Sequence, residues 1–104
     1  MKTYKGKMEN GNAVVTVNGE SLDQIVRASP SGFNWGYSGD GPTDLAYSVL
    51  ADLYDEQLAE EYHEDFMDDI IRMLEQDSEW EMTEKHIQFW LWGVTPNPWE
   101  EENR

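Results

Sequence analysis

The sequence contains no cysteine, which excludes disulfide bonds and metal sites built from thiolates. It also has no uninterrupted apolar run near the roughly 18 residues that a membrane-spanning helix requires. The opening residues 1–6 lack the apolar segment of a secretory signal peptide. We therefore expect a protein that is neither exported by that route nor embedded in a membrane, and that resides in the cytoplasm.

Basic residues are also scarce, with 7 Lys and Arg against 22 Asp and Glu and a formal net charge of -15. The imbalance begins partway along the chain. Residues 1–39 carry 4 basic and 3 acidic residues, a net of +1, whereas residues 40–104 carry 3 basic and 19 acidic residues, a net of -16. Such a charge repels nucleic acids and anionic membranes. We expect neither as a direct partner, and any partner should be a basic protein.

The N-terminal residues have the pattern of a β-hairpin. Weak alternation over residues 2–8 and a β-branched run over residues 13–17 flank Asn10 and Gly11, which tolerate the positive φ of a tight turn. Further short strands are predicted at residues 33–37 and 78–82.

Three helices are predicted after this hairpin. The first begins at Pro42, whose fixed φ suits a helix start, and ends near Tyr54. The second runs from about residue 56 to about residue 75, because its apolar residues, which include Met73, recur on one half of a helical wheel. A third is capped by Thr83 and ends near Gly93.

The chain length limits this architecture to one domain. A chain of 104 residues buries roughly two thirds of its unfolded surface, which is enough for one core. We predict an α+β domain over residues 1–93, in which an N-terminal antiparallel β-hairpin or small sheet is packed by three helices. Residues 94–104 are predicted to form a flexible acidic tail, because Pro96 and Pro98 stop the third helix.

A motif rich in glycine and aromatic residues precedes the first predicted helix and reads SPSGFNWGYSGDGPTDLA over residues 29–46. With Trp80-x-Met82-Thr83 further along, it resembles a family of small uncharacterised domains of bacteria, archaea and their viruses and mobile elements. The resemblance covers roughly residues 3–91. Because that family has no assigned activity, the resemblance implies a fold and a genomic setting, with the host cytoplasm as the location if a virus encodes the chain.

The same motif is a candidate ligand pocket. Gly39 and Gly41 expose backbone N–H groups ahead of a helix, an arrangement that binds anions, with Trp35, Tyr37 and Asp40 around it. The Walker and dinucleotide-binding patterns are both absent, and Asp40 would repel a phosphate. We favour a loop that stabilises itself, with a pocket formed by Trp35, Tyr37 and Asp40 as the second interpretation.

Patterns for catalysis and metal binding are incomplete. Residues 36–40 resemble a nucleophile elbow but have Asp40 where that motif requires glycine. Glu60 and His63 have the spacing of one ligand pair of a di-metal bundle, but such a site needs a second pair, which the chain lacks. We therefore predict no catalytic residue, no metal site and no cofactor, and a protein that is not an enzyme.

The second predicted helix carries a dense row of acidic residues. Eight acids between Asp55 and Asp69 span about 22 Å, or one charge per about 2.8 Å, between the roughly 3.4 Å of one DNA strand and 1.7 Å of the duplex. No basic residue relieves this row before Arg72. Ile71 falls on the same face as an apolar anchor. The predicted partner-binding residues are Glu56, Glu60, Glu61, Glu64, Asp65, Asp68, Asp69 and Ile71.

The third predicted helix is apolar on nearly all sides, and a domain this small cannot bury every side of it. We expect Phe89 and Trp92, with Trp99 beyond the helix, to form a patch for self-association, which would make a homodimer.

The leading hypothesis is a non-enzymatic acidic binding protein that engages the nucleic-acid groove of a basic partner, with carboxylates in place of phosphates. Given the setting implied by the resemblance, its most concrete form is a phage or mobile-element inhibitor of a host defence nuclease, similar to an anti-CRISPR protein. Two alternatives stay open. One is a small-ligand or enzymatic domain centred on the WGYSGDGP loop, and the other is an oligomerising accessory protein.

Overall fold

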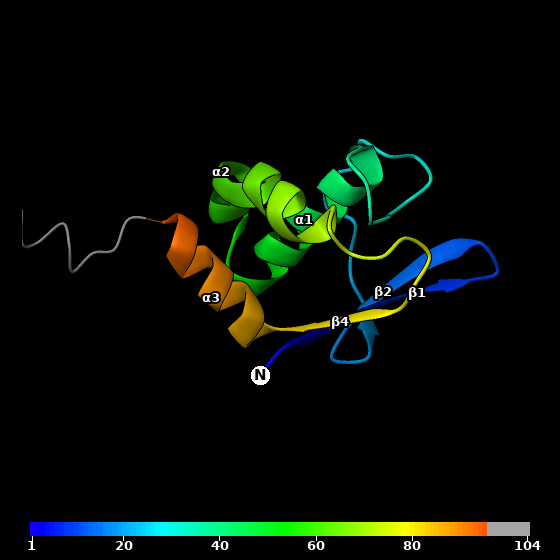
Figure 1. Cartoon of the computed structure of the whole chain (residues 1–104), viewed down its shortest axis with the longest axis horizontal. Coiled ribbons are helices and arrows are strands. Elements are labelled where there is room, and N and C mark those ends of the chain that lie inside the picture. The colour runs from blue at the N-terminus through cyan, green and yellow to red at the C-terminus, as the bar shows by residue number, and fades with distance from the viewer. Residues whose placement is uncertain (96–104) are drawn as a thin grey trace, which may run out of the picture.

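A computed structural model of the chain describes residues 1–95 and shows a four-stranded antiparallel sheet with helices on one side (Figure 1). The strands are β1 (Thr3–Glu9), β2 (Asn12–Val17), β3 (Glu20–Ser21) and β4 (Trp80–Thr83), in the order β3-β2-β1-β4. Asn10 and Gly11 adopt φ values of 53° and 81° in the turn between β1 and β2. The predicted hairpin and the predicted α+β class are therefore both confirmed.

The last strand, β4, closes the sheet from the far end of the sequence. It runs antiparallel to β1 with Gly6 opposite Trp80 and Thr3 opposite Thr83. A Cβ atom at Gly6 would lie 2.3 Å from the Trp80 indole ring, so only glycine lets this ring pack against the strand. The indole also meets the fully buried Trp35 edge to face, with ring centroids 5.6 Å apart.

The helical part consists of α1 (Asp40–Leu53), α2 (Glu56–Phe66), a π-helical turn η1 (Met67–Ile71) and α3 (Glu84–Val94). Asp55 caps α2 by accepting a 2.8 Å hydrogen bond from the backbone N–H of Leu58. The Thr83 hydroxyl caps α3 by accepting one from the backbone N–H of His86. Helices α1 and α2 pack together beside the sheet, and α3 extends away from the end of β4 (Figure 1).

Two elements differ from the sequence-based prediction at the glycine-rich motif. Residues 33–37 form no strand, because Gly36 takes a left-handed φ of 86° that interrupts an extended segment. The first helix begins at Asp40 with Gly39 as its N-cap, two residues before Pro42. Pro42 is tolerated there because the first turn of a helix has no intrahelical partner for its missing N–H.

The core lies between the sheet and α1, α2 and η1. Its largest fully buried side chains are those of Trp35, Tyr4, Phe66, Leu45, Leu50 and Ile71. Asp44 is buried among them and accepts hydrogen bonds from the Ser29 backbone N–H at 2.8 Å and from Gln24 Nε2 at 2.9 Å. These two bonds fix the segment that leads into the glycine-rich motif. Within residues 1–95, none of the helices combines the length and apolarity needed to cross a membrane.

Candidate functional site: an acidic helical surface

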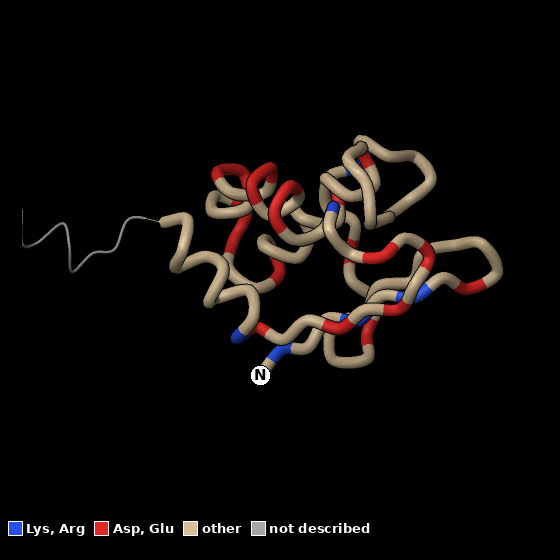
Figure 2. Tube along the Cα trace, viewed as in Figure 1, with Lys and Arg blue, Asp and Glu red and all other residues tan. Residues whose placement is uncertain are grey.

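Seven carboxylate side chains of α2 and η1 form the strongest charged feature of the molecule, and we call them the acidic surface. All seven are exposed to solvent, and they belong to one continuous helical stretch along which acidic positions recur (Figure 2). They are Glu56, Glu60, Glu61, Glu64, Asp65, Asp68 and Asp69. The opposite side of the same stretch carries the buried Ala59, Phe66 and Ile71, which anchor it to the core.

Little within the molecule neutralises the acidic surface. Between residues 1 and 95 the structure contains two salt bridges, Lys2 with Asp52 at 3.1 Å and Lys7 with Glu9 at 3.6 Å. Neither includes a carboxylate of the acidic surface. Over the same residues, no group of three or more His, Cys, Asp or Glu side chains is placed to hold a metal ion. The field of these carboxylates therefore extends into solvent.

Neutral donors contact two members of the acidic surface. Asp69 accepts a 2.9 Å hydrogen bond from Trp90 Nε1, and Glu56 accepts one of 3.4 Å from the Tyr47 hydroxyl. The first of these joins α3 to η1, and the Trp90 ring also packs on Phe66 with centroids 4.8 Å apart. These contacts position the two carboxylates without cancelling their charge.

The tyrosines beneath this surface remain in their neutral form. Burial raises the pKa of Tyr47, and the nearby charges of Glu56 and Glu60 raise it further. Burial also raises the pKa of Tyr62, to which the charges of Glu61 and Asp65 add. Both rings therefore serve as packing groups at neutral pH.

The prediction that Ile71 is an exposed anchor within the acidic surface is wrong, because Ile71 is fully buried. The error comes from continuing a regular α-helix to residue 75. The backbone N–H of Arg72 instead donates to the Met67 carbonyl at 2.8 Å, a π-type bond that spans five residues. This wider turn contains one more residue, so Ile71 rotates into the core while Met73, predicted to face inward, is 68% exposed.

The glycine-rich loop stabilises the fold. Trp35 is fully buried and donates from Nε1 to the Ser78 carbonyl at 3.1 Å, so it presents no surface to a ligand. Gly36 donates its N–H to the Ile71 carbonyl at 3.0 Å, which docks the loop on the end of η1. Tyr37 and Asp40 are exposed, at the end of this loop and in the first turn of α1. Trp35 is thus buried, whereas the other two members of the predicted pocket are exposed.

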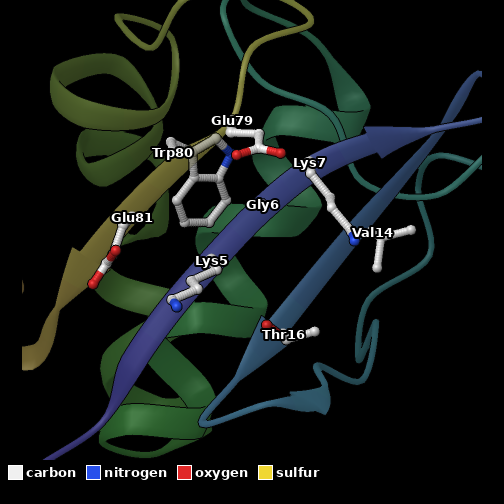
Figure 3. A pocket seen from close by; sticks show the side chains of 8 residues that line it. All are labelled: Lys5, Gly6, Lys7, Val14, Thr16, Glu79, Trp80 and Glu81. Atoms are coloured by element: carbon white, nitrogen blue, oxygen red, sulfur yellow. The ribbon is translucent and has the colours of Figure 1, made fainter.

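A cavity of about 540 Å³ lies instead on the outer side of the sheet (Figure 3). Its lining residues are Lys5, Gly6, Lys7, Val14, Thr16, Glu79, Trp80 and Glu81. This cavity is not among the sequence-based predictions, although alternation along β1 places Lys5 and Lys7 on one side of the strand. Two lysines face two glutamates here, so the site has no excess of either charge. The acidic surface, with seven carboxylates free of cations in the described chain, is the stronger candidate.

Two of the three residues predicted for self-association lie on the outside of α3. Phe89 is 78% exposed and Trp92 is 65% exposed. Trp99 lies outside the described residues, as does most of the predicted acidic tail.

Comparison with known proteins yields one match. A family model described as "Family of unknown function (DUF6166)" matches residues 4–93, which is almost the whole of the described chain. No curated protein and no solved structure matches this chain.

Proposed function

The chain belongs to the DUF6166 family, whose function is unknown, and we propose that it is a non-enzymatic binding protein whose acidic surface docks into the nucleic-acid groove of a basic partner. The carboxylates occupy the positions that phosphates take in the partner's normal complex. The observation that carries this proposal is the set of seven exposed carboxylates on one helical stretch, none of them in an ion pair within residues 1–95.

The energetics of α2 support a role beyond solubility. Carboxylates repel each other at the i,i+4 pairs 56/60, 60/64, 61/65, 64/68 and 65/69. Each pair costs a few tenths of a kcal/mol in the isolated protein. A positively charged partner would relieve all of these costs at once, whereas solubility is obtained equally well from dispersed charges.

The most specific form of the proposal is an inhibitor of a host defence nuclease, similar to an anti-CRISPR protein and encoded by a phage or other mobile element. Nucleases of this kind hold nucleic acid in positively charged channels. A small acidic protein that fills such a channel excludes the nucleic acid without performing chemistry. It acts inside the host cell, where its target resides.

Affinity capture with two matched variants tests the proposal. The first variant replaces the seven carboxylates of the acidic surface by the corresponding amides. The second replaces seven exposed carboxylates elsewhere and so has the same net charge. Its positions are Glu9, Glu20, Asp23, Glu75, Asp77, Glu79 and Glu81.

We expect the wild-type protein and the second variant to retain basic nucleic-acid-binding proteins from an extract of the host cell. A DNA duplex or guide RNA should release them, and the first variant should retain less than about a tenth as much, since several charge contacts of roughly 1 kcal/mol are lost. Equal retention by the first variant would refute the proposal. So would equal loss in both variants, because only net charge would then matter.

A further inference from the structure

The outer side of α3 carries an aromatic stripe, which we define as Lys85, Phe89 and Trp92. These residues are exposed and follow the i, i+4, i+7 spacing of a helix-packing seam. The inner side of α3 is already anchored by Ile87 and Leu91, which are buried. Two large aromatic side chains therefore stand in solvent without contributing to the attachment of α3.

The distribution of charge makes this stripe a place where two copies can approach without strong repulsion. Residues 85–95 contain no Asp or Glu, although the whole chain has a net charge of -15. Two copies that meet through the acidic surface repel each other strongly. Two copies that meet along residues 85–95 approach each other through a segment that carries no carboxylate.

The polarity of α3 favours an antiparallel arrangement of two such helices. Lys85 lies in the first turn beside Glu84, and the last turn has no basic residue, so the negative end of the helix dipole has no cation from its own helix. Against an antiparallel copy of the same helix, each Lys85 ammonium group lies beside the partner's carboxyl end. Phe89 and Trp92 are three residues apart, about 4.5 Å of rise, so a two-fold axis between them brings each ring beside the other ring of the partner.

We propose that the aromatic stripe joins two copies of this chain in an antiparallel, two-fold symmetric dimer. Full burial of an aromatic side chain removes about 150 to 250 Å² from water, and Phe89 and Trp92 are 78% and 65% exposed, so the four rings bury at most about 400 to 700 Å² in total. This area is below that of a standard stable interface, so the dimer is weak and reversible. It leaves all seven carboxylates of the acidic surface unused, and it stands independently of the function proposed above.

Sedimentation equilibrium of the full chain tests this dimer. Protein concentrations from about 10 μM to 1 mM cover the dissociation constants expected for weak association. The average mass should rise from one chain to two with concentration. The double variant Phe89→Glu/Trp92→Glu should keep the mass of one chain throughout. The matched control Ile25→Glu/Met73→Glu, which adds the same charge at exposed apolar residues outside α3, should associate like the wild type.

Salt separates this proposal from that of the acidic surface. Raising the NaCl concentration should strengthen the dimer, because it screens the repulsion between two copies of equal charge. It should weaken the complex with a basic partner. The dimer proposal is overturned if the wild-type chain keeps the mass of one copy at 1 mM. It is also overturned if a chain shortened to end at Thr95 dimerises and the full chain does not, because residues beyond Thr95 would then occupy the stripe.

A crosslinking pair covers the case in which the double variant does not fold. The chain has no cysteine, so a disulfide forms only between introduced thiols of two copies. Gln88→Cys, beside the stripe, should give a disulfide-linked dimer at least about tenfold faster than Gln57→Cys on α2, since pairing raises the effective thiol concentration. Equal rates for the two variants overturn the proposal.

Discussion

At the scale of single residues, the junction between the sheet and α1 depends on one polar cluster. The Tyr4 hydroxyl donates to Asp52 Oδ2 at 2.6 Å, and Lys2 Nζ donates to the same oxygen at 3.1 Å. Burial raises the pKa of Tyr4 far above its ordinary value of 10.0, and the hydrogen bond and charge of Asp52 raise it further. The folded protein therefore keeps this phenol neutral at pH values where the unfolded chain ionises it.

This linkage predicts how stability depends on alkaline pH. Because the folded pKa lies above the unfolded one, the stabilisation from Tyr4 is complete below pH 10 and is lost as the pH rises above 10. Burial raises the pKa of Tyr47, Tyr54 and Tyr62 as well. All four tyrosines therefore contribute to the loss of stability of the wild type above pH 10.

Tyr4→Phe removes the contribution of this hydroxyl. Urea unfolding should give a variant that is about 1 kcal/mol less stable at pH 7, the usual loss for one hydrogen bond. Its stability should then fall less steeply than that of the wild type between about pH 10 and pH 11.5. An equally steep fall in the two proteins would show that Tyr4 ionises alike in the folded and unfolded states.

At the scale of elements, the π-helical turn η1 decides which residues of the second helical stretch face the core. Its i to i+5 bond from Arg72 to Met67 turns Ile71 inward and leaves Met73 outside. The turn therefore leaves Met73, and not Ile71, exposed beyond the last carboxylate of the acidic surface. The helix also ends soon after, where the Gly36 loop docks on it.

A pair of alanine substitutions tests this register by chemical denaturation. Ile71→Ala should lower the free energy of unfolding by about 2 to 5 kcal/mol, because it leaves a cavity in the core. Met73→Ala should change it by less than about 0.5 kcal/mol, because that side chain is mostly exposed. A regular α-helix through residue 75 would reverse the order of the two effects.

Local sequence signals predict some elements of this fold and miss others. The turn at Asn10-Gly11 and the cap at Thr83 were predicted correctly, because each depends on the conformational preference of a few adjacent residues. The π turn was missed, because a hydrophobic wheel assumes one fixed angle per residue. The cavity beside Lys5 was also missed, because β1 and β4 meet across more than 70 residues of sequence.

At the scale of the whole molecule, mixed charge and uniform negative charge occupy different elements. Lys2, Lys5 and Lys7 lie on and beside β1 among acidic neighbours, whereas the acidic surface lies on α2 and η1 (Figure 2). The molecule therefore offers three distinct surfaces to a partner. They are the acidic surface, the outer side of the sheet and the aromatic stripe of α3.

Site-specific photocrosslinking in a host extract distinguishes these three surfaces in one measurement. A photoreactive side chain is placed at Gln57 beside the acidic surface, at Thr16 in the sheet cavity or at Gln88 beside the aromatic stripe. Substituting these neutral residues leaves every carboxylate in place.

We expect the Gln57 probe to crosslink to a basic nucleic-acid-binding protein, and excess DNA duplex to abolish that crosslink. The Thr16 probe should not reach this partner, and the Gln88 probe should crosslink to a second copy of the chain. A partner crosslink that forms only from Thr16 or Gln88, or one from Gln57 that persists in excess DNA, would contradict the central claim that the acidic surface replaces nucleic acid.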